Sequence, residues 1–156
     1  MSKVGLRALK QQNNTRGFLN QSAWILQFIK HQTPEICLEA VRQYGGALRY
    51  VKDQTEKICL EAVRQNVSAL EYVKYQTEEL CLEAVRRHGW ALRYVKNQTE
   101  DVCLEAVKQN GMALEYVKNQ TEDICLIAVQ WSSIMIFYVK DDSMIQRLRE
   151  ILDRKT

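Results

Sequence analysis

Apolar and polar positions recur along most of this chain with a period of 22 residues and without insertions. Each repeat opens with the pair Gln-Thr, first at residues 32–33 and last at residues 120–121, and positions within a repeat are numbered from that Gln. A degenerate copy precedes these, since Ile25, Leu26 and Phe28 fall in register with the next repeat. A fixed period of this length is typical of solenoids, whose units bury their apolar faces by stacking on one another.

The first half of each repeat has the pattern of a short amphipathic α-helix. Apolar residues at positions 5, 6, 7, 9 and 10 cover one arc at about 100° per residue, whereas positions 4, 8, 11 and 12 are polar. Thr at position 2 is a suitable N-cap, and acidic residues follow it at the positive end of the helix dipole. Pro34 fits the first helical position, where its missing N–H costs nothing. The predicted helices span 34–43, 56–65, 78–87, 100–109 and 122–131.

The second half of each repeat predicts a helix of about two turns. Ala, Leu and Val at positions 16, 17 and 20 form its buried stripe. Gly45, Gly89 and Gly111, at position 14, are expected to supply the left-handed residue that closes the first helix. Neither helix is long enough to be stable alone, so stacking of repeats must stabilise both. The predicted second helices span 46–52, 68–74, 90–96, 112–118 and 134–140.

These patterns predict an all-α solenoid of tandem two-helix repeats with capping terminal helices and no β-sheet in 32–141. The 156 residues suit a single domain. Its parts are a basic N-terminal cap (1–22), the tandem repeats (23–141) and a C-terminal capping helix (142–156), with Ser143 as the N-cap of a helix over 143–153. The N-terminal cap rests on the apolar residues Val4, Leu6, Leu9, Phe18 and Leu19.

The last repeat is apolar at positions 8, 12, 15 and 18, which are mostly polar in the others. The C-terminal helix, with its apolar face, is expected to cover these residues. The alternative is that the same residues form a dimer or partner interface. The candidates for this cap or oligomer contact are Ile127, Trp131, Ile134, Phe137, Leu148, Ile151 and Leu152.

Charge is unevenly distributed along the chain. Residues 1–31 carry five basic and no acidic residues, and the other 17 basic and 19 acidic residues give the remainder a charge of −2. Nucleic-acid readers usually have a basic face on their main body. The Lys row at position 21 and the Arg/Lys row at position 11 could follow phosphates, but acidic rows at positions 3, 4 and 8 are equally regular. Nucleic-acid binding through the basic N-terminal segment is therefore the less favoured alternative.

Neither a transmembrane helix nor a signal peptide is expected, because the chain has no run of 18 apolar residues and no apolar stretch near its start. No membrane partner is predicted. The predicted location is cytoplasmic, in a host cell or in the organism's own, or in a virion if the protein is viral.

The five Cys occupy position 6, in the middle of the apolar arc, and are expected to be reduced and buried. Stacked helices lie about 8–10 Å apart, whereas a disulfide needs Cα atoms within roughly 7 Å. No Cys/His spacing suits zinc. His31 and His88 stand alone, and there is no glycine-rich phosphate loop. The sequence therefore predicts no catalytic residue, no metal site, no cofactor and no enzyme activity.

Positions 13, 15, 18 and 22 vary between repeats while the remainder of the pattern stays fixed. Large apolar residues with Arg nearby are typical anchors of protein interfaces. Two alternatives are drift at unconstrained surface positions and, for the Arg/Glu alternation at position 18, a salt-bridge ladder between repeats. The candidate partner-binding residues are Tyr44, Arg49, Glu71, His88, Trp90, Arg93, Met112 and Glu115.

The repeat at residues 98–119 (QTEDVCLEAVKQNGMALEYVKN) resembles a short helical repeat of unknown function that is abundant in giant DNA viruses of amoebae. The resemblance covers about residues 23–141, and Val67-Ser68 is a local departure from it. It implies a viral, intracellular protein and carries no enzyme activity, cofactor or site residues. The leading hypothesis is a non-enzymatic interaction module or adaptor that binds a host or viral protein. The alternatives are a nucleic-acid-binding solenoid and a structural homo-oligomer, such as a homodimer, joined through the C-terminal repeat.

Overall fold

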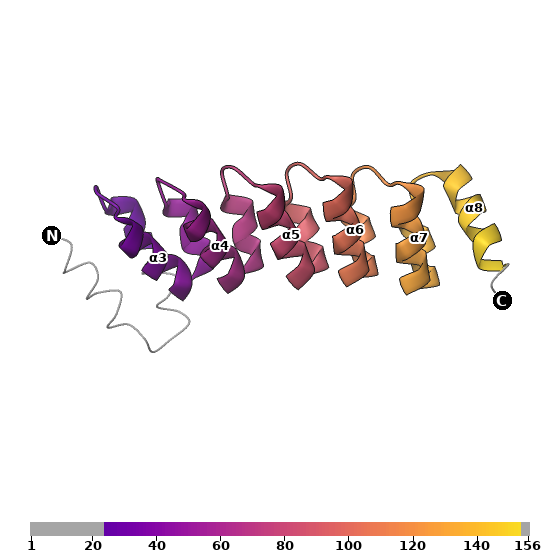
Figure 1. The fold of residues 1–156 in the computed structure, drawn as a ribbon, viewed down its shortest axis with the longest axis horizontal. Helices are drawn as coiled ribbons and strands as arrows, with labels where there is room; N and C mark the ends of the chain where they lie inside the picture. Colours follow the sequence, from indigo (N-terminus) through magenta and orange to yellow (C-terminus); the bar gives the residue numbers. More distant parts are fainter. Residues whose placement is uncertain (1–23, 154–156) are drawn as a thin grey trace. The chain divides into compact units, whose positions relative to one another are not determined.

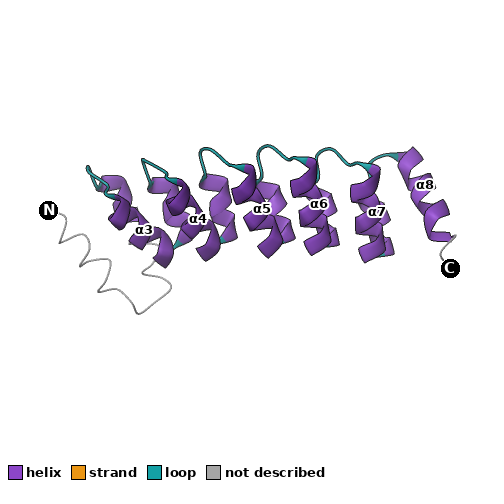
Figure 2. Cartoon of the chain, in the orientation of Figure 1, coloured by secondary structure: helices purple, strands orange, loops and turns teal. Residues whose placement is uncertain are grey.

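The computed structural model describes residues 24–153, all of whose regular secondary structure is helical (Figure 2). The predicted N-terminal cap over 1–22 and residues 154–156 lie outside these residues. The chain divides into two compact units, Met1–Tyr75 and Gln76–Thr156, called the first and second unit below. In each unit, tandem helix pairs pack against their neighbours, which confirms the all-α repeat solenoid.

The first unit contains two complete repeats and part of a preceding one. Helices α3 and α4 pack side by side, and the 3₁₀ helix η2 contacts both of them as well as η3. Its elements are η1 (Leu26–Phe28), α3 (Pro34–Gln43), η2 (Gly45–Tyr50), α4 (Glu56–Gln65) and η3 (Val67–Tyr72).

The second unit contains three complete repeats and the C-terminal helix (Figure 1). α6 packs between α5 and α7, and the 3₁₀ helix η5 packs between η4 and η6. The elements are α5 (Glu78–Arg87), η4 (Gly89–Tyr94), α6 (Glu100–Gln109), η5 (Gly111–Tyr116), α7 (Glu122–Trp131), η6 (Ser133–Tyr138) and α8 (Asp142–Asp153).

The first helix of each repeat begins and ends where the sequence predicts. The N-cap Thr accepts a hydrogen bond from the backbone N–H three residues later, at 3.3–3.4 Å, in α3, α4, α5 and α6. Thr121 of α7 makes no such bond, and its hydroxyl instead donates to Glu100 at 3.1 Å. The caps explain why these helix starts are readable from sequence.

The second helix of each repeat is a 3₁₀ helix of six residues, so a second helix is present as predicted, and the predicted span of seven residues was one residue too long. In η2 the chain closes with a hydrogen bond of 3.1 Å from the Val51 N–H to the Leu48 carbonyl, three residues back. Val51 is then extended, with φ −75° and ψ 121°. Each helix starts one residue earlier and ends two residues earlier than predicted. Short connecting segments commonly adopt this tighter helix.

The prediction that position-14 glycines adopt a left-handed conformation was also wrong. No glycine of residues 24–153 has positive φ, and α3 ends at Tyr44 in an extended conformation. The glycine is needed because the next repeat passes close to it. A Cβ on Gly45 would overlap the Ala62 carbonyl oxygen, and one on Gly89 would overlap that of Ala106. Glycine therefore permits close approach of neighbouring repeats.

The core consists of apolar residues from both helices of each repeat. The largest fully buried side chains include the position-17 leucines, Leu48, Leu70, Leu92 and Leu114. The position-7 leucines, such as Leu82, are only half-buried. The sequence had placed position 7 in the same apolar arc as the core, but it lies at the edge of that arc.

The Gln at position 1 is a bridging residue that the sequence pattern did not reveal. In the second unit, the Gln98 amide donates to the Leu92 and Tyr116 carbonyls at 3.3 and 3.0 Å. Its Oε1 accepts from the Lys118 N–H at 2.9 Å and from the Cys103 thiol at 3.7 Å. Gln32, Gln54 and Gln120 make equivalent bonds. One side chain thus satisfies backbone groups of two consecutive repeats, at the ends of their 3₁₀ helices.

Candidate functional site

The five cysteines are unpaired and buried, as predicted. Burial raises the pKa of each thiol, to about 11 for Cys81 and Cys125. These thiols are therefore protonated at neutral pH, whereas cysteine nucleophiles and metal ligands act as thiolates. Within residues 24–153, no group of three or more His, Cys, Asp or Glu side chains is placed to hold a metal ion.

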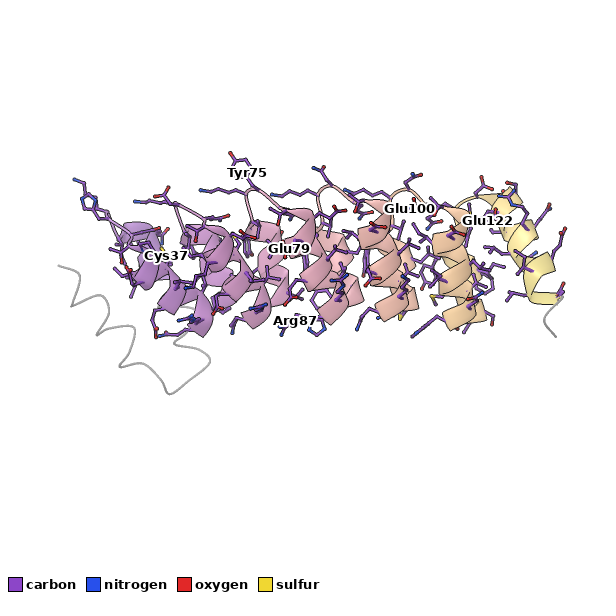
Figure 3. All side chains as sticks on the ribbon, in the orientation of Figure 1. Cys37, Tyr75, Glu79, Arg87, Glu100 and Glu122 are labelled. Carbon is purple, nitrogen blue, oxygen red and sulfur yellow. The ribbon has the colours of Figure 1, made fainter. Side chains whose placement is uncertain are left out.

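A recess of about 150 Å³ in the second unit lies between α6 and the start of α7, beside Cys103. Its polar side chains join neighbouring repeats. Glu100 accepts from the Thr121 hydroxyl at 3.1 Å, and the Lys118 ammonium donates to the Lys96 carbonyl at 2.9 Å. Figure 3 shows Glu100 and Glu122 at the same ends of α6 and α7. The recess thus belongs to the junction between repeats.

The position-21 lysines donate to backbone carbonyls of the preceding repeat. Within the first unit, Lys52 reaches the Ile29 carbonyl at 3.1 Å and Lys74 reaches the Lys52 carbonyl at 2.6 Å. Within the second, Lys140 reaches the Val117 carbonyl at 2.6 Å. These ammonium groups therefore stabilise the ends of the 3₁₀ helices.

The position-11 cations form ion pairs, mainly with the next repeat. Arg42 binds Glu61 at 2.8 Å and Arg86 binds Glu105 at 3.1 Å, and each of these pairs joins one repeat to the next. Lys108 does bind Glu105 of its own helix, at 3.1 Å. Hydrogen bonds from the two arginines lower the pKa of Glu61 and Glu105. Both basic rows are thus occupied by acceptors of the protein itself.

The variable positions of the two complete repeats of the first unit form a largely polar surface. The half-buried Tyr44 ring lies over Gly46, where a Cβ would be 2.5 Å from the ring. The exposed Arg49 guanidinium lies 5.2 and 5.3 Å from the centroids of the Tyr50 and Tyr72 rings. Glu71 is exposed. Arg49 therefore stacks on tyrosines of two repeats, and a salt-bridge ladder at position 18 is not what the structure forms.

The second unit carries an aromatic cluster, defined as His88, Trp90, Arg93, Tyr94 and Tyr116. Trp90 lies 5.8 Å from His88 and 6.0 Å, edge to face, from Tyr94, measured between ring centroids. The Arg93 guanidinium lies 5.3 and 5.6 Å from the Tyr94 and Tyr116 centroids. Trp90 is half-buried, and His88 and Arg93 are exposed. His88, Trp90 and Arg93 were candidates from the sequence. The two tyrosines were not, because position 19 is Tyr in every complete repeat and the candidates were chosen from variable positions.

The aromatic cluster is followed by further exposed residues on the next 3₁₀ helix. Met112, at the same repeat position as Trp90, is 49% exposed, and Glu115 is also exposed. Because η4 packs against η5, these residues extend the same surface. The aromatic cluster together with Met112 and Glu115 is called the binding face below.

The residues at positions 13 and 18 change together from one repeat to the next. Tyr44 and His88 accompany an Arg at position 18, whereas Asn66 and Asn110 accompany a Glu. The two Asn side chains cap their 3₁₀ helices, accepting from the N–H two residues later at 3.0 Å. These surface residues therefore recur in every second repeat, whereas the buried residues of the scaffold recur in every repeat.

The C-terminal helix covers only part of the last repeat. α8 buries Met144 and Leu148, Ile127, Ile151 and Leu152 are half-buried, and Arg147 binds Glu122 of α7 at 3.3 Å. The predicted N-cap was wrong, because Asp141 and not Ser143 accepts from the Met144 N–H, at 2.8 Å.

Three of the four apolar residues expected under α8 remain exposed, which corrects the prediction of full cover. Trp131, Ile134 and Phe137 are 55%, 61% and 80% exposed. Met112 at position 15 and Arg93 and Glu115 at position 18 are exposed as well, so Ile134 and Phe137 lie on a side of the repeat that α8, which packs on α7, does not cover. These three residues and Tyr138 form the C-terminal patch. Another exposed aromatic, Tyr75 at the variable position 22, points away from the helices of the first unit (Figure 3).

The alternation over two repeats matches the length of a known family model. The model described as a domain of unknown function, DUF4116, matches residues 33–76, 77–121 and 99–144, each spanning two repeats. The chain belongs to this family. The family model thus supports the predicted repeat of unknown function, while its viral origin stays a prediction. The comparisons of this DUF4116 protein with curated proteins and with solved structures found no significant match. Among the described residues, no helix is long and apolar enough to span a membrane.

Proposed function

We propose that this chain is a non-enzymatic protein-interaction module and that the binding face of the second unit contacts its partner. The observation that carries the proposal is the set of half-buried Trp90 and exposed Arg93 and Met112 on consecutive 3₁₀ helices. Trp, Met and Arg are enriched in protein interfaces, and Trp and Arg contribute a large share of binding energy.

The invariant positions support this choice because they are already used inside the protein. The Gln at position 1 bonds to backbone groups, and the Lys at position 21 donates to carbonyls of the previous repeat. Position-11 cations pair with glutamates. Only the variable positions are left to distinguish one partner from another, and among the complete repeats those of the second unit carry the larger apolar anchors.

The partner should present apolar side chains to Trp90 and Met112, and an acceptor to Arg93, whose guanidinium is held in place by two tyrosines. A stacked guanidinium retains its donors for a carboxylate or carbonyl at the rim. If the chain is viral, as its resemblance implies, the partner is a host or viral protein in the host cytoplasm or the virion.

The nucleic-acid alternative is weaker, because its two basic rows are engaged with carbonyls and carboxylates of the protein. The basic segment within 1–22 lies outside the described residues. Retention on a nucleic-acid column that falls steeply with salt would favour this alternative.

The proposal is tested by affinity capture with the immobilised chain and two variants altered at position 15. Trp90→Ala removes the anchor of the binding face, and Ser68→Ala is the matched control in the first unit. We expect proteins retained by the wild type to be retained by Ser68→Ala and depleted by Trp90→Ala. Equal retention by all three proteins would contradict the proposal.

A further inference from the structure

An arginine at position 18 fills the space between the tyrosines of two consecutive repeats. In the second unit, the Arg93 guanidinium lies 5.3 and 5.6 Å from the centroids of the Tyr94 and Tyr116 rings. In the first unit, Arg49 lies 5.2 and 5.3 Å from the tyrosines of its own and the following repeat. These distances are within the range of about 6 Å over which an aromatic ring attracts a cation. The scaffold thus forms the same guanidinium site twice with its own side chains.

The next space of this kind in the second unit, between Tyr116 and Tyr138, receives no arginine from position 18. The backbone holds the two tyrosines alike, because their carbonyls accept from the Gln98 and Gln120 amides at 3.0 and 2.9 Å. Position 18 is here Glu115, which is exposed. Within the part of the chain that the structure describes, Glu115 forms no ion pair and no cation lies over the Tyr138 ring, which belongs to a residue that is 38% exposed. Glu115, Tyr116 and Tyr138 are called the Glu115 site below.

The lysines that follow the two tyrosines of the Glu115 site are used elsewhere. The Lys118 ammonium donates to the Lys96 carbonyl at 2.9 Å, and the Lys140 ammonium donates to the Val117 carbonyl at 2.6 Å. The Glu115 site therefore offers a carboxylate and two aromatic rings, and the cation that would complete it has to come from another molecule.

A guanidinium suits the Glu115 site better than an ammonium does. It is planar, stacks on aromatic rings and can donate two parallel hydrogen bonds to one carboxylate, whereas an ammonium is compact and strongly hydrated. The protein itself places arginine between tyrosine rings at position 18 and directs the lysines of position 21 to carbonyls. The exposed Phe137, next to Tyr138 in the chain, adds an apolar surface for the aliphatic part of an arginine.

We propose that the Glu115 site binds an arginine side chain of the partner protein, with the guanidinium between the Tyr116 and Tyr138 rings and paired with the Glu115 carboxylate. This inference rests on the proposed function, because it assigns the arginine to the partner of the binding face. Arg93 and Glu115 then require an acceptor and an arginine on the partner, separated by one repeat, or about 8–10 Å. A partner segment with only acidic or only basic residues would meet a like charge at one of the two positions.

The site is tested on the full chain without any partner, with N-acetyl-arginine methylamide as the probe. The control is the matching citrulline derivative, whose neutral urea replaces the guanidinium. The ring signals of Tyr116 and Tyr138 in nuclear magnetic resonance spectra should shift saturably with the arginine probe, in the millimolar range, and much less with the citrulline control.

Three variants at position 18 sharpen this titration. Glu115→Gln should weaken binding of the arginine probe about threefold or more, because the charged acceptor is lost. Glu71→Gln, the same change in the first unit, should leave the shifts of the Tyr116 and Tyr138 signals unchanged. Glu115→Arg should abolish them, because the chain's own guanidinium then fills the space as Arg93 does one repeat earlier. Glu71 and Glu115 are exposed, so all three variants should keep the circular dichroism spectrum of the wild type.

Equal shifts with the arginine and citrulline derivatives, or no shift with either, would overturn the proposal, as would wild-type affinity in Glu115→Gln. Affinity capture with Glu115→Gln beside Trp90→Ala separates this inference from the proposed function. Retained proteins depleted by both variants support both. Depletion by Trp90→Ala alone leaves the proposed function standing and overturns the assignment of the arginine to the partner. Depletion by Glu115→Gln alone supports the Glu115 site and removes Trp90 as the anchor, and depletion by neither contradicts both proposals.

Discussion

The two units use the same scaffold and present different surfaces. Leu48 and Leu92 are equally buried, and Gln54 and Gln98 make the same bonds. At position 15 of the complete repeats, however, the first unit has Gly46 and Ser68, whereas the second has Trp90, Met112 and Ile134.

The comparison separates positions that fold the chain from positions that give it an identity. Arg49 and Arg93 both lie between two tyrosine rings, so even the stacking on position 18 is shared. What differs is the apolar side chain beside each arginine. If this account is right, equivalent scaffold substitutions have equal costs in both units, and only surface substitutions distinguish them.

The largest expected effect is the loss of a buried position-17 leucine. Leu48→Ala and Leu92→Ala should each lower the free energy of unfolding by about 2–5 kcal/mol, because each leaves a cavity at a fully buried site. Denaturant unfolding followed by circular dichroism measures both. A cost in one unit less than half that in the other would show that the two cores are packed differently.

Removal of the bridging glutamine should be the next largest effect. Gln54→Ala and Gln98→Ala leave the Lys74 and Lys118 N–H groups and several carbonyls without their partner, which costs about 1–3 kcal/mol. The control is Gln130→Ala, an exposed glutamine, with an expected change within about 0.5 kcal/mol. Equal effects of all three substitutions on the unfolding midpoint would contradict the bridging role.

Glycines in the same turn should respond unequally to substitution. Gly45→Ala and Gly89→Ala force a Cβ onto a backbone carbonyl of the next repeat and should each cost about 1–3 kcal/mol. The atoms nearest to a Cβ on Gly46 belong to the Tyr44 ring, which can rotate away, so Gly46→Ala should cost less. Thermal unfolding of the three variants ranks them, and a larger loss for Gly46→Ala would refute the close approach of repeats.

The smallest expected effect comes from the ion pairs between repeats. Because Arg42 and Arg86 lower the folded-state pKa of Glu61 and Glu105 below the ordinary 4.5, these pairs stabilise the fold above about pH 4.5, and the stabilisation is lost as the pH falls through the lower folded-state value. Glu61→Gln and Glu105→Gln should each cost less than about 1 kcal/mol at neutral pH. The difference in free energy of unfolding between each variant and the wild type should shrink as the pH is lowered. A difference that grows in acid would contradict the stabilising role of these ion pairs.

The helix starts were predictable because a local signal marks them. Thr followed by acidic residues and an apolar arc needs only a few neighbouring residues to be read, and the bounds of α3 to α7 agree with the prediction. The 3₁₀ helices were not predictable in the same way, because six residues do not separate a period of 3.0 from one of 3.6.

The missed features depend on contacts between repeats. The glycine at position 14 reads as a helix terminator, but the reason for it is the Ala62 or Ala106 carbonyl, 17 residues later. The glutamine at position 1 reads as a polar residue before the N-cap. The exposure of Phe137 was missed as well, because α8 was expected to cover a side of the last repeat that it does not reach.

The most direct test of the account is the affinity of the captured partner for three purified proteins, measured together with their stabilities. Trp90→Ala should weaken binding by at least about 1 kcal/mol, or roughly fivefold, with a much smaller loss of stability than Leu92→Ala causes, and Ser68→Ala should bind like the wild type. If Trp90→Ala instead unfolds the chain while its folded fraction binds normally, Trp90 belongs to the core and the recognition surface lies elsewhere.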